Sequence, residues 1–225
     1  MRILVVTATA AEVAPLTGAL RPCAAAGEVQ SITRDAHSID VLTTGVGMVA
    51  TGVWTSRALL RDRYDLVLNL GLCGSFRPEL PPGTVVHIVA DRLSELGAED
   101  DDAFLSVHDL QLLGTDEFPF ASGELRNANP PGNETLARFR TVRGITVNTV
   151  HGNDASIARV VERLDPDVES MEGAAFMYAC LIAGMPFAQV RAVSNLVERR
   201  NRGGWKLRDA IDALGEAAFA IIDHA

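Results

Sequence analysis

The chain of 225 residues is poor in the residues that several kinds of site require. Lys206 is its only lysine, which excludes a Walker A phosphate-binding loop. Its three cysteines, Cys23, Cys73 and Cys180, lack C-x-x-C spacing, so we expect neither a disulfide framework nor a zinc site. No apolar run reaches the roughly 18 to 20 residues of a membrane span, and the first ten residues predict a strand and a turn instead of a signal peptide.

Positive charge is also scarce. The chain has 20 basic and 29 acidic residues and a net charge of −9, which argues against a nucleic acid or an anionic membrane as partner. The acidic run 99–102 lacks the ligand spacing and the glycine of a calcium loop, so we expect a solvated charge run there. These observations predict a cytoplasmic protein that acts on a small molecule and holds no metal or cofactor.

Apolar runs that predict strands alternate with segments that have helical spacing. This alternation predicts an α/β fold in one domain, residues 1–225, with helix layers on both sides of a central mixed, largely parallel sheet. The segment 91–131 has weak periodicity and predicts a long excursion with short helical turns. The expected strands are 3–7, 28–36, 39–44, 64–70, 84–90, 144–150 and 186–193, and the clearest expected helices are 154–164, 173–184 and 205–224.

The stretch 168–176 places acidic residues before a helix that is otherwise apolar. Glu172 stands at the start of this helix, where backbone N–H groups favour a carboxylate. It either caps the helix together with Ser170 or binds a polar ligand in a pocket. Glu169 is expected at the surface.

Other polar residues follow expected strands, where open α/β sheets bind their ligands. Glu12 follows the first strand, and Thr9 and Glu12 also have the T-x-x-E spacing of a capping box. The glycines of 43–47 predict a tight turn. The segment 71–76 predicts either a plain turn or a loop whose N–H groups face a ligand. Ser194 and Asn195 end a late strand. His151 follows another strand and either lines a pocket or caps the loop, and we expect the second.

The order of these segments resembles the purine nucleoside phosphorylase and nucleosidase superfamily over nearly the whole chain. The segments that carry the resemblance are TATAAE with Glu12, TTGVG at 43–47, GLCGS at 71–75, ESMEGAA at 169–175 and VRAVSN at 190–195. The nucleosidase branch is the most similar. The resemblance implies a nucleoside phosphorylase-like three-layer α/β/α sandwich and a homo-oligomer.

The resemblance also implies hydrolysis of an N-ribosidic bond. It gives Glu12 the role of activating the attacking water and Glu172 that of binding the ribose hydroxyls. Ser194 and Asn195 meet the purine near N7. Such roles suit an oxocarbenium-like transition state and a leaving base that gains negative charge. The other implied substrate contacts are Gly71, Val150 and Met171, which packs on the sugar.

Asn195 departs from the family pattern, because adenine-releasing nucleosidases have an aspartic acid at this position. An amide NH₂ can donate to the O6 atom of a 6-oxopurine, so we expect hypoxanthine as the leaving base. This points to the subgroup that hydrolyses futalosine on the menaquinone route, and the segments 91–100 and 194–206 are similar to it. An arginine at 199, 200 or 202 could receive the benzoate of that substrate.

Three alternatives stay open at the level of the sequence. One is a nucleosidase for methylthioadenosine or S-adenosylhomocysteine. Another is a phosphorylase, although no cationic residue lies in the loop after the first strand. The third is a nucleoside-binding protein without catalysis.

Overall fold

The computed structural model describes residues 1–18 and 25–225. Cys23 and the end of the helical pattern expected up to residue 22 lie outside the described residues. The strands are β1 (Arg2–Thr7), β2 (Glu28–Arg34), β3 (His37–Thr43), β4 (Leu66–Ser75), β5 (Val85–Leu93), β6 (Gly97–Asp100), β7 (Ala103–Ser106), β8 (Phe120–Ala121), β9 (Glu124–Arg126), β10 (Arg140–Thr146), β11 (Val168–Ser170) and β12 (Phe187–Leu196). The helices are η1 (Ala10–Val13), α1 (Ala14–Thr17), α2 (Met48–Arg61), α3 (Glu134–Arg138), α4 (Asp154–Leu164), α5 (Gly173–Ala183), η2 (Arg202–Gly204) and α6 (Leu207–Asp223).

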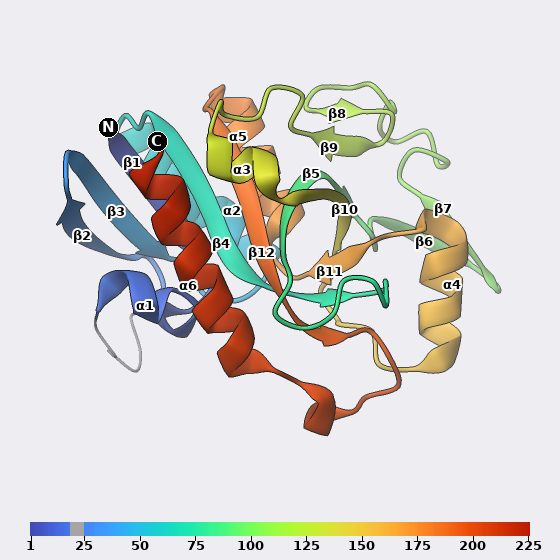
Figure 1. The fold of residues 1–225 in the computed structure, drawn as a ribbon. Helices are drawn as coiled ribbons and strands as arrows, with labels where there is room; N and C mark the ends of the chain where they lie inside the picture. Colours follow the sequence, from blue (N-terminus) through green and yellow to red (C-terminus); the bar gives the residue numbers. More distant parts are fainter. Residues whose placement is uncertain (19–24) are drawn as a thin grey trace.

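One mixed sheet organises the chain. Its strand order is β2-β3-β1-β4-β11-β10-β5-β9-β8, and β12 pairs with both β4 and β5. The pairings of β12 close the strands β4, β11, β10, β5 and β12 into a ring, whereas β1, β2 and β3 extend as an open sheet (Figure 1). The predicted α/β class with a central mixed sheet is confirmed. β4 pairs with β1 of the open sheet and with β12 of the ring, and β12 runs parallel to β4. The carboxyl ends of β4 and β12 therefore lie where the ring and the open sheet join.

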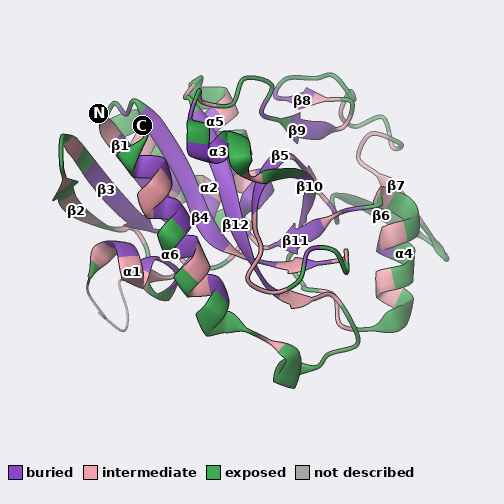
Figure 2. Ribbon diagram, viewed as in Figure 1, coloured by how far each residue is buried: buried purple, intermediate pink, exposed green. Residues whose placement is uncertain are grey.

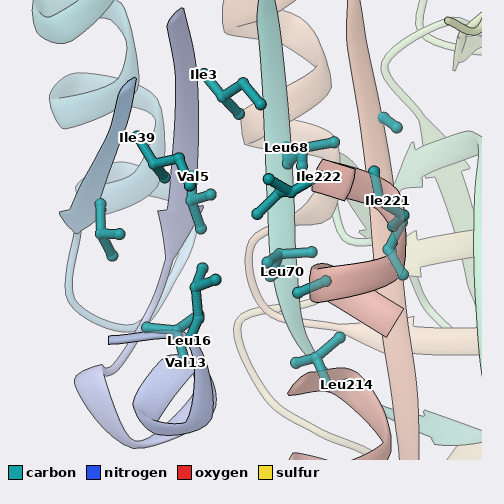
Figure 3. Close-up of a cluster of buried hydrophobic side chains, with 14 of the residues drawn as sticks. Ile3, Val5, Val13, Leu16, Ile39, Leu68, Leu70, Leu214, Ile221 and Ile222 are labelled. Carbon is teal, nitrogen blue, oxygen red and sulfur yellow. The ribbon is translucent and has the colours of Figure 1, made fainter. Parts of the chain in front are cut away.

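The open part of the sheet is covered on both faces. Ile3 and Val5 of β1 pack in a cluster with α1, α3 and α6, whereas Leu4 and Val6 pack in a cluster with α2 and α5. This alternation follows from the period of two in a strand, and it explains why β1 is an uninterrupted apolar run. Figure 3 shows the first cluster between the strands and α6, and Figure 2 shows buried strands between helices with exposed outer faces.

The helix that follows Glu172 is mostly buried, as its apolar composition predicts. Its eleven residues carry no charge; six of them are buried, whereas Tyr178 and Ile182 are exposed. Gly184 ends it with a φ of 62°, a left-handed conformation that glycine adopts without strain. The expected end of this helix is confirmed.

Two segments differ from their predictions. The segment 91–131 contains no helix in the structure; β5 continues to Leu93, and two short hairpins, β6–β7 and β8–β9, follow. The acidic run 99–102 forms the exposed turn of the first hairpin, as expected for a solvated run. The segment 71–76 is not a loop, because β4 continues through Ser75. Glycines in a strand mimic a loop in the sequence, although they also allow a close approach of neighbouring groups.

Candidate active site

Glu12 is the buried acidic residue at the carboxyl end of β1. Only 9% of it is exposed, and it lies in the short turn η1. The backbone N–H of Thr9 donates to its Oε2 over 2.8 Å, and the hydroxyl of Thr7 lies 3.0 Å from the same oxygen. Its Oε1 accepts from the backbone N–H of Leu72 over 3.1 Å. Glu12 therefore has the capping contact that the sequence predicts, and it also reaches across to β4.

Burial has a chemical consequence for this carboxyl group. Desolvation raises the pKa of Glu12 above its usual value, and nearby Glu172 raises it further, whereas Arg191 and the two backbone N–H groups lower it. The net direction is upward. A carboxylate of raised pKa binds a proton more readily than an ordinary one, which is the property that the predicted role of Glu12 requires.

Glu172 is the second buried carboxylate of the site and forms the N-cap of α5. Its Oε1 accepts from the backbone N–H of Gly47 over 3.2 Å. Gly47 has a φ of 99°, which glycine tolerates best, and it begins α2. The turn expected at 43–47 is therefore present, and it also contributes a backbone donor to Glu172. The capping alternative holds in part: Glu172 occupies the N-cap without a side-chain bond to the helix, and Ser170 Oγ accepts from the backbone N–H of Gly173 over 3.2 Å. Binding of a ligand by Glu172 stays a prediction.

Arg191 forms an ion pair with Glu172 and acts on Glu12 through its charge, and it is a residue that the sequence did not reveal. It is 1% exposed in the middle of β12. Its Nη1 donates to Glu172 Oε2 over 3.1 Å, and its Nη2 donates to Asn69 Oδ1 over 2.7 Å. The backbone oxygen of Leu72 also accepts from Nη1, over 3.2 Å. A single charge inside an otherwise apolar strand is the sequence signal that could have revealed it, since such charges are rarely buried without a partner.

Gly71 lets these charged groups come together. A Cβ atom at this position would lie 2.4 Å from Arg191 Nη1 and 3.2 Å from Glu12 Oε1. The absence of a side chain on β4 therefore makes room for the guanidinium and the carboxylate. Gly71 was expected to contact substrate. In this structure it adjoins Arg191 and Glu12, and contact with a substrate stays a prediction.

Ser194 and Asn195 follow Arg191 by three and four residues, at the carboxyl end of β12. Val193 pairs with Cys73 and Asn195 pairs with Gly74, so Ser194 is an extra residue in β12, a β-bulge. Adjacent residues of a regular strand point to opposite faces, but here Ser194 Oγ donates to Asn195 Oδ1 over 2.8 Å. The Asn195 amide donates one N–H to the Leu196 backbone oxygen over 2.9 Å, which leaves its second N–H available to a ligand.

Residues of β4 set the spacing between the carboxylates and the amide. Leu72 binds Glu12, and Gly74, two residues later, pairs with Asn195. Two residues of a strand span about 7 Å. β4 therefore carries the contact to Glu12 and the pairing with Asn195 about 7 Å apart along one strand.

A hollow lies beside Asn195. Its lining includes Val150 and Asn195, which the sequence predicted as substrate contacts, but not Glu12, Met171 or Glu172. Met171 is half-buried directly before Glu172. Arg200 borders the same hollow, whereas Arg199 and Arg202 do not. The remaining lining residues are Gly74, His151, Glu169, Leu196, Glu198, Asn201 and Trp205.

Glu169 is buried, not exposed as the sequence suggested. It is 3% exposed in β11, and its Oε2 lies 2.6 Å from His151 Nδ1. Its Oε1 accepts from the backbone N–H of His151 over 3.0 Å. The expectation failed because the partner that compensates burial of the carboxylate comes from a segment 18 residues away. Likewise, His151 borders the hollow rather than only capping a loop.

No cluster of three or more metal-ligating side chains occurs within residues 1–18 and 25–225. No helix in these same ranges has the length and apolar character needed to cross a membrane.

Known proteins resemble this chain in sequence. The family model of the Phosphorylase superfamily matches residues 2–225. A futalosine hydrolase of Streptomyces coelicolor is 36% identical over 184 residues, which cover 79% of this chain and 76% of that protein. A futalosine hydrolase of Acidothermus cellulolyticus is 32% identical over 234 residues, which cover 99% and 90%. A 5'-methylthioadenosine/S-adenosylhomocysteine nucleosidase of Marinomonas sp. is 26% identical over 183 residues, which cover 74% and 72%.

Solved structures share the fold at low identity. A methylthioadenosine/S-adenosylhomocysteine nucleosidase of Helicobacter pylori superposes with a TM-score of 0.79 at 14% identity, covering 100% of this chain and 99% of that one. The futalosine hydrolase of Helicobacter pylori superposes with a TM-score of 0.78 at 13% identity, covering 100% and 98%. The chain belongs to the phosphorylase superfamily, with futalosine hydrolases among its relatives.

Proposed function

We propose that this protein hydrolyses the N-ribosidic bond of futalosine and releases hypoxanthine and dehypoxanthine futalosine. The observation that carries the proposal is the buried carboxylate pair of Glu12 and Glu172 around Arg191, with the Asn195 amide about two residues further along β4. The names of the relatives that are 36% and 32% identical support the same activity.

The sugar is the first place where the reaction needs protein groups. Cleavage of the glycosidic bond leaves positive charge on the ribose, and a carboxylate beside it stabilises that charge. Glu12, whose pKa burial raises, takes the proton of the attacking water. Glu172 accepts hydrogen bonds from the ribose hydroxyls while Arg191 and Gly47 hold it in place, and Met171 packs against the sugar.

The leaving base is the second part of the substrate at which the reaction needs protein groups. Ser194 fixes the Asn195 amide by donating to Oδ1, so the free N–H of Asn195 is a donor of defined direction. A donor suits the carbonyl oxygen O6 of hypoxanthine and mismatches the amino group of adenine. A site built on such a hydrogen bond can discriminate by several orders of magnitude, because the wrong base leaves buried groups unpaired.

Water suits this site better than phosphate as the nucleophile. Phosphate requires cationic groups with free donors. Among the described residues, Arg191 is the basic side chain that interacts with Glu12, and its N–H groups already bond to Glu172, Asn69 and the Leu72 oxygen. We therefore place a water molecule, not phosphate, beside Glu12.

A nucleoside panel tests the proposal. The purified protein is incubated in phosphate-free buffer with futalosine, inosine, methylthioadenosine and S-adenosylhomocysteine, and released bases are separated by chromatography. We expect hypoxanthine from futalosine at the highest kcat/KM. Preferential release of adenine would move the assignment to the methylthioadenosine nucleosidases, and binding without any release would make the protein a nucleoside-binding module.

We also propose a homo-oligomer that forms through α2 and α5. Val49, Val53 and Leu60 project from α2 with exposed fractions of 80%, 59% and 89%, and Tyr178 and Ile182 of α5 are exposed as well. The two helices pack side by side, so these side chains form one apolar surface. Light scattering after size exclusion should give a multiple of 24.0 kDa for the wild type and a smaller mass for V53E. A monomeric wild type would refute the interface.

A further inference from the structure

Glu169 and His151 form a buried acid–imidazole pair that the proposed mechanism does not use. Both oxygens of Glu169 accept from His151, one from its backbone N–H over 3.0 Å and one from Nδ1 over 2.6 Å. The Nδ1 atom is therefore engaged with Glu169, which leaves Nε2 as the second ring nitrogen. Phe76 packs edge-on against the imidazole ring with centroids 6.1 Å apart, so the ring orientation is fixed on a second side.

The pair lies opposite Asn195 across a single glycine. Gly74 of β4 pairs with Glu169 of β11 on one side and with Asn195 of β12 on the other. A Cβ atom at Gly74 would lie 3.3 Å from Asn195 Nδ2 and 3.5 Å from the Cγ atom of Glu169. Directly paired residues of neighbouring strands face the same side of a sheet. Asn195 and the pair therefore border one hollow, which His151 also lines.

The second nitrogen of His151 is available to a ligand. Within the described residues, His151 Nε2 takes part in no hydrogen bond. It is also not one of the side-chain atoms there that are both buried and without a hydrogen-bond partner, which are Thr55 Oγ1 and His87 Nε2. Since Nδ1 faces Glu169, Nε2 is the ring nitrogen left for a ligand; His151 lines the hollow beside Asn195 and also a second hollow formed with residues of β6, β7 and α4. An imidazole held by a carboxylate can carry a proton on both nitrogens, so Nε2 can serve as an acid.

The leaving base creates a need for such an acid. When the C–N bond breaks, its electron pair goes to the purine, which leaves more readily if a ring nitrogen gains a proton. The Asn195 amide and the Ser194 hydroxyl can donate hydrogen bonds but do not release protons near neutral pH. Neither residue at the bulge of β12 therefore supplies the proton.

We propose that His151, oriented by Glu169, is the general acid that protonates the leaving purine. The inference rests on the proposed hydrolysis. The C–N electron pair moves to the base as the Nε2 proton moves to a free ring nitrogen, and water bonds to the anomeric carbon as Glu12 takes one of its protons. One proton is lost by His151 and one is gained by Glu12, and exchange with solvent restores both. Glu169 is a positioning residue that stabilises the imidazolium.

The decisive variant is H151N. The amide of asparagine can occupy the place of Nδ1 and keep the hydrogen bond to Glu169, but it has no group in place of Nε2. The wild type and H151N are both assayed on futalosine and on 4-nitrophenyl riboside, whose nitrophenolate leaves without a proton. H37N is the matched control, because His37 contacts the N-terminus on β3, far from the site in sequence and on another strand. Thermal unfolding checks that each variant is folded.

We expect H151N to lower kcat on futalosine by about 10² to 10³-fold with KM changed less than about threefold, and to change cleavage of the nitrophenyl substrate by less than about threefold. E169Q should lower kcat on futalosine less severely, and H37N should match the wild type. Equal losses on both substrates, or a loss on futalosine below about threefold, would overturn the general acid. If the wild type does not cleave the nitrophenyl substrate, the kinetics on futalosine decide. A fall in kcat with KM changed less than about threefold supports the general acid, and a change mainly in KM overturns it. A wild type that releases no base from any nucleoside contradicts the proposed function itself.

Discussion

Arg191 of β12 and Glu172 at the start of α5 form an ion pair of 3.1 Å that is almost fully withdrawn from water. The ion pair links β12, which carries Ser194 and Asn195, to α5, whose N-cap Glu172 is the predicted ribose contact. Because each charge compensates the other in a medium of low polarity, neither can be removed alone without a large cost.

Replacement of Arg191 by methionine tests this link. R191M keeps a long apolar side chain but leaves Glu172 buried without its counter-charge, so the free energy of unfolding should fall by about 3 to 5 kcal/mol. Urea unfolding monitored by circular dichroism gives the value. R138M is the control, since Arg138 is exposed and its ion pair with Glu134 is 3.9 Å long; it should change stability by less than about 1 kcal/mol. A similar small change in R191M would show that the pair contributes little.

A single methyl group at Gly71 should disturb the site without removing any charge. In G71A the new Cβ would lie 2.4 Å from Arg191 Nη1 and 3.2 Å from Glu12 Oε1, so the guanidinium must move away from β4. Displacements of about 1 Å in a catalytic group can reduce activity about 100-fold, and we expect a loss of kcat/KM of that order. G132A is the matched control, because a Cβ at Gly132 meets no atom within 4 Å. Equal activity of the two variants would contradict the close packing.

Asn195 offers a change of specificity. In N195D a carboxyl group replaces the amide, so the position can accept a hydrogen bond from the amino group of adenine but no longer donates to O6 when ionised. The ratio of kcat/KM for a 6-aminopurine nucleoside to that for its 6-oxopurine counterpart should rise by at least about tenfold. The ratio is measured with methylthioadenosine and methylthioinosine. An unchanged ratio would remove Asn195 from the choice of base.

A buried carboxyl group near the site predicts a pH dependence of stability. Burial raises the pKa of Asp91 from 3.8 to about 6, although Gln189 and Thr146 donate to it. A raised pKa in the folded state means that stability from this group is fully present below pH 3.8 and is lost as the pH rises through about 6. At about 1.4 kcal/mol for each pKa unit, the loss is about 3 kcal/mol.

D91N isolates this contribution, because other groups titrate in the same range. The difference in unfolding free energy between wild type and D91N should move in favour of the variant by about 3 kcal/mol between pH 3.5 and pH 7. Parallel pH profiles for the two proteins would show that Asp91 is not the titrating group.

The parts of the site that sequence could predict are those that local pattern determines. Glu12 follows an apolar run at T-x-x-E spacing, and Glu172 interrupts an apolar segment, so both stood out without a structure. Asn195 stood out by its residue type at the end of a strand. The helices 154–164 and 173–184 were also predictable, because their composition or periodicity identifies them.

The parts that escaped prediction depend on pairing between distant segments. The bulge at Ser194 is a property of the register between β12 and β4, which no local pattern encodes. Glu169 appeared exposed because His151, its partner, belongs to another element. Glycines at 71 and 74 suggested a loop, yet they keep β4 open for groups from η1, β11 and β12.

The most direct test of the account follows the oxygen atom that replaces the base. Futalosine is incubated with the wild type and with E12Q in phosphate-free buffer made with H₂¹⁸O, and hypoxanthine and the sugar product are analysed by mass spectrometry. We predict that the wild type releases hypoxanthine and places one ¹⁸O on the anomeric carbon, and that E12Q still binds futalosine but turns it over at least about 10²-fold more slowly. A strict requirement for phosphate, or full activity of E12Q, would contradict the account.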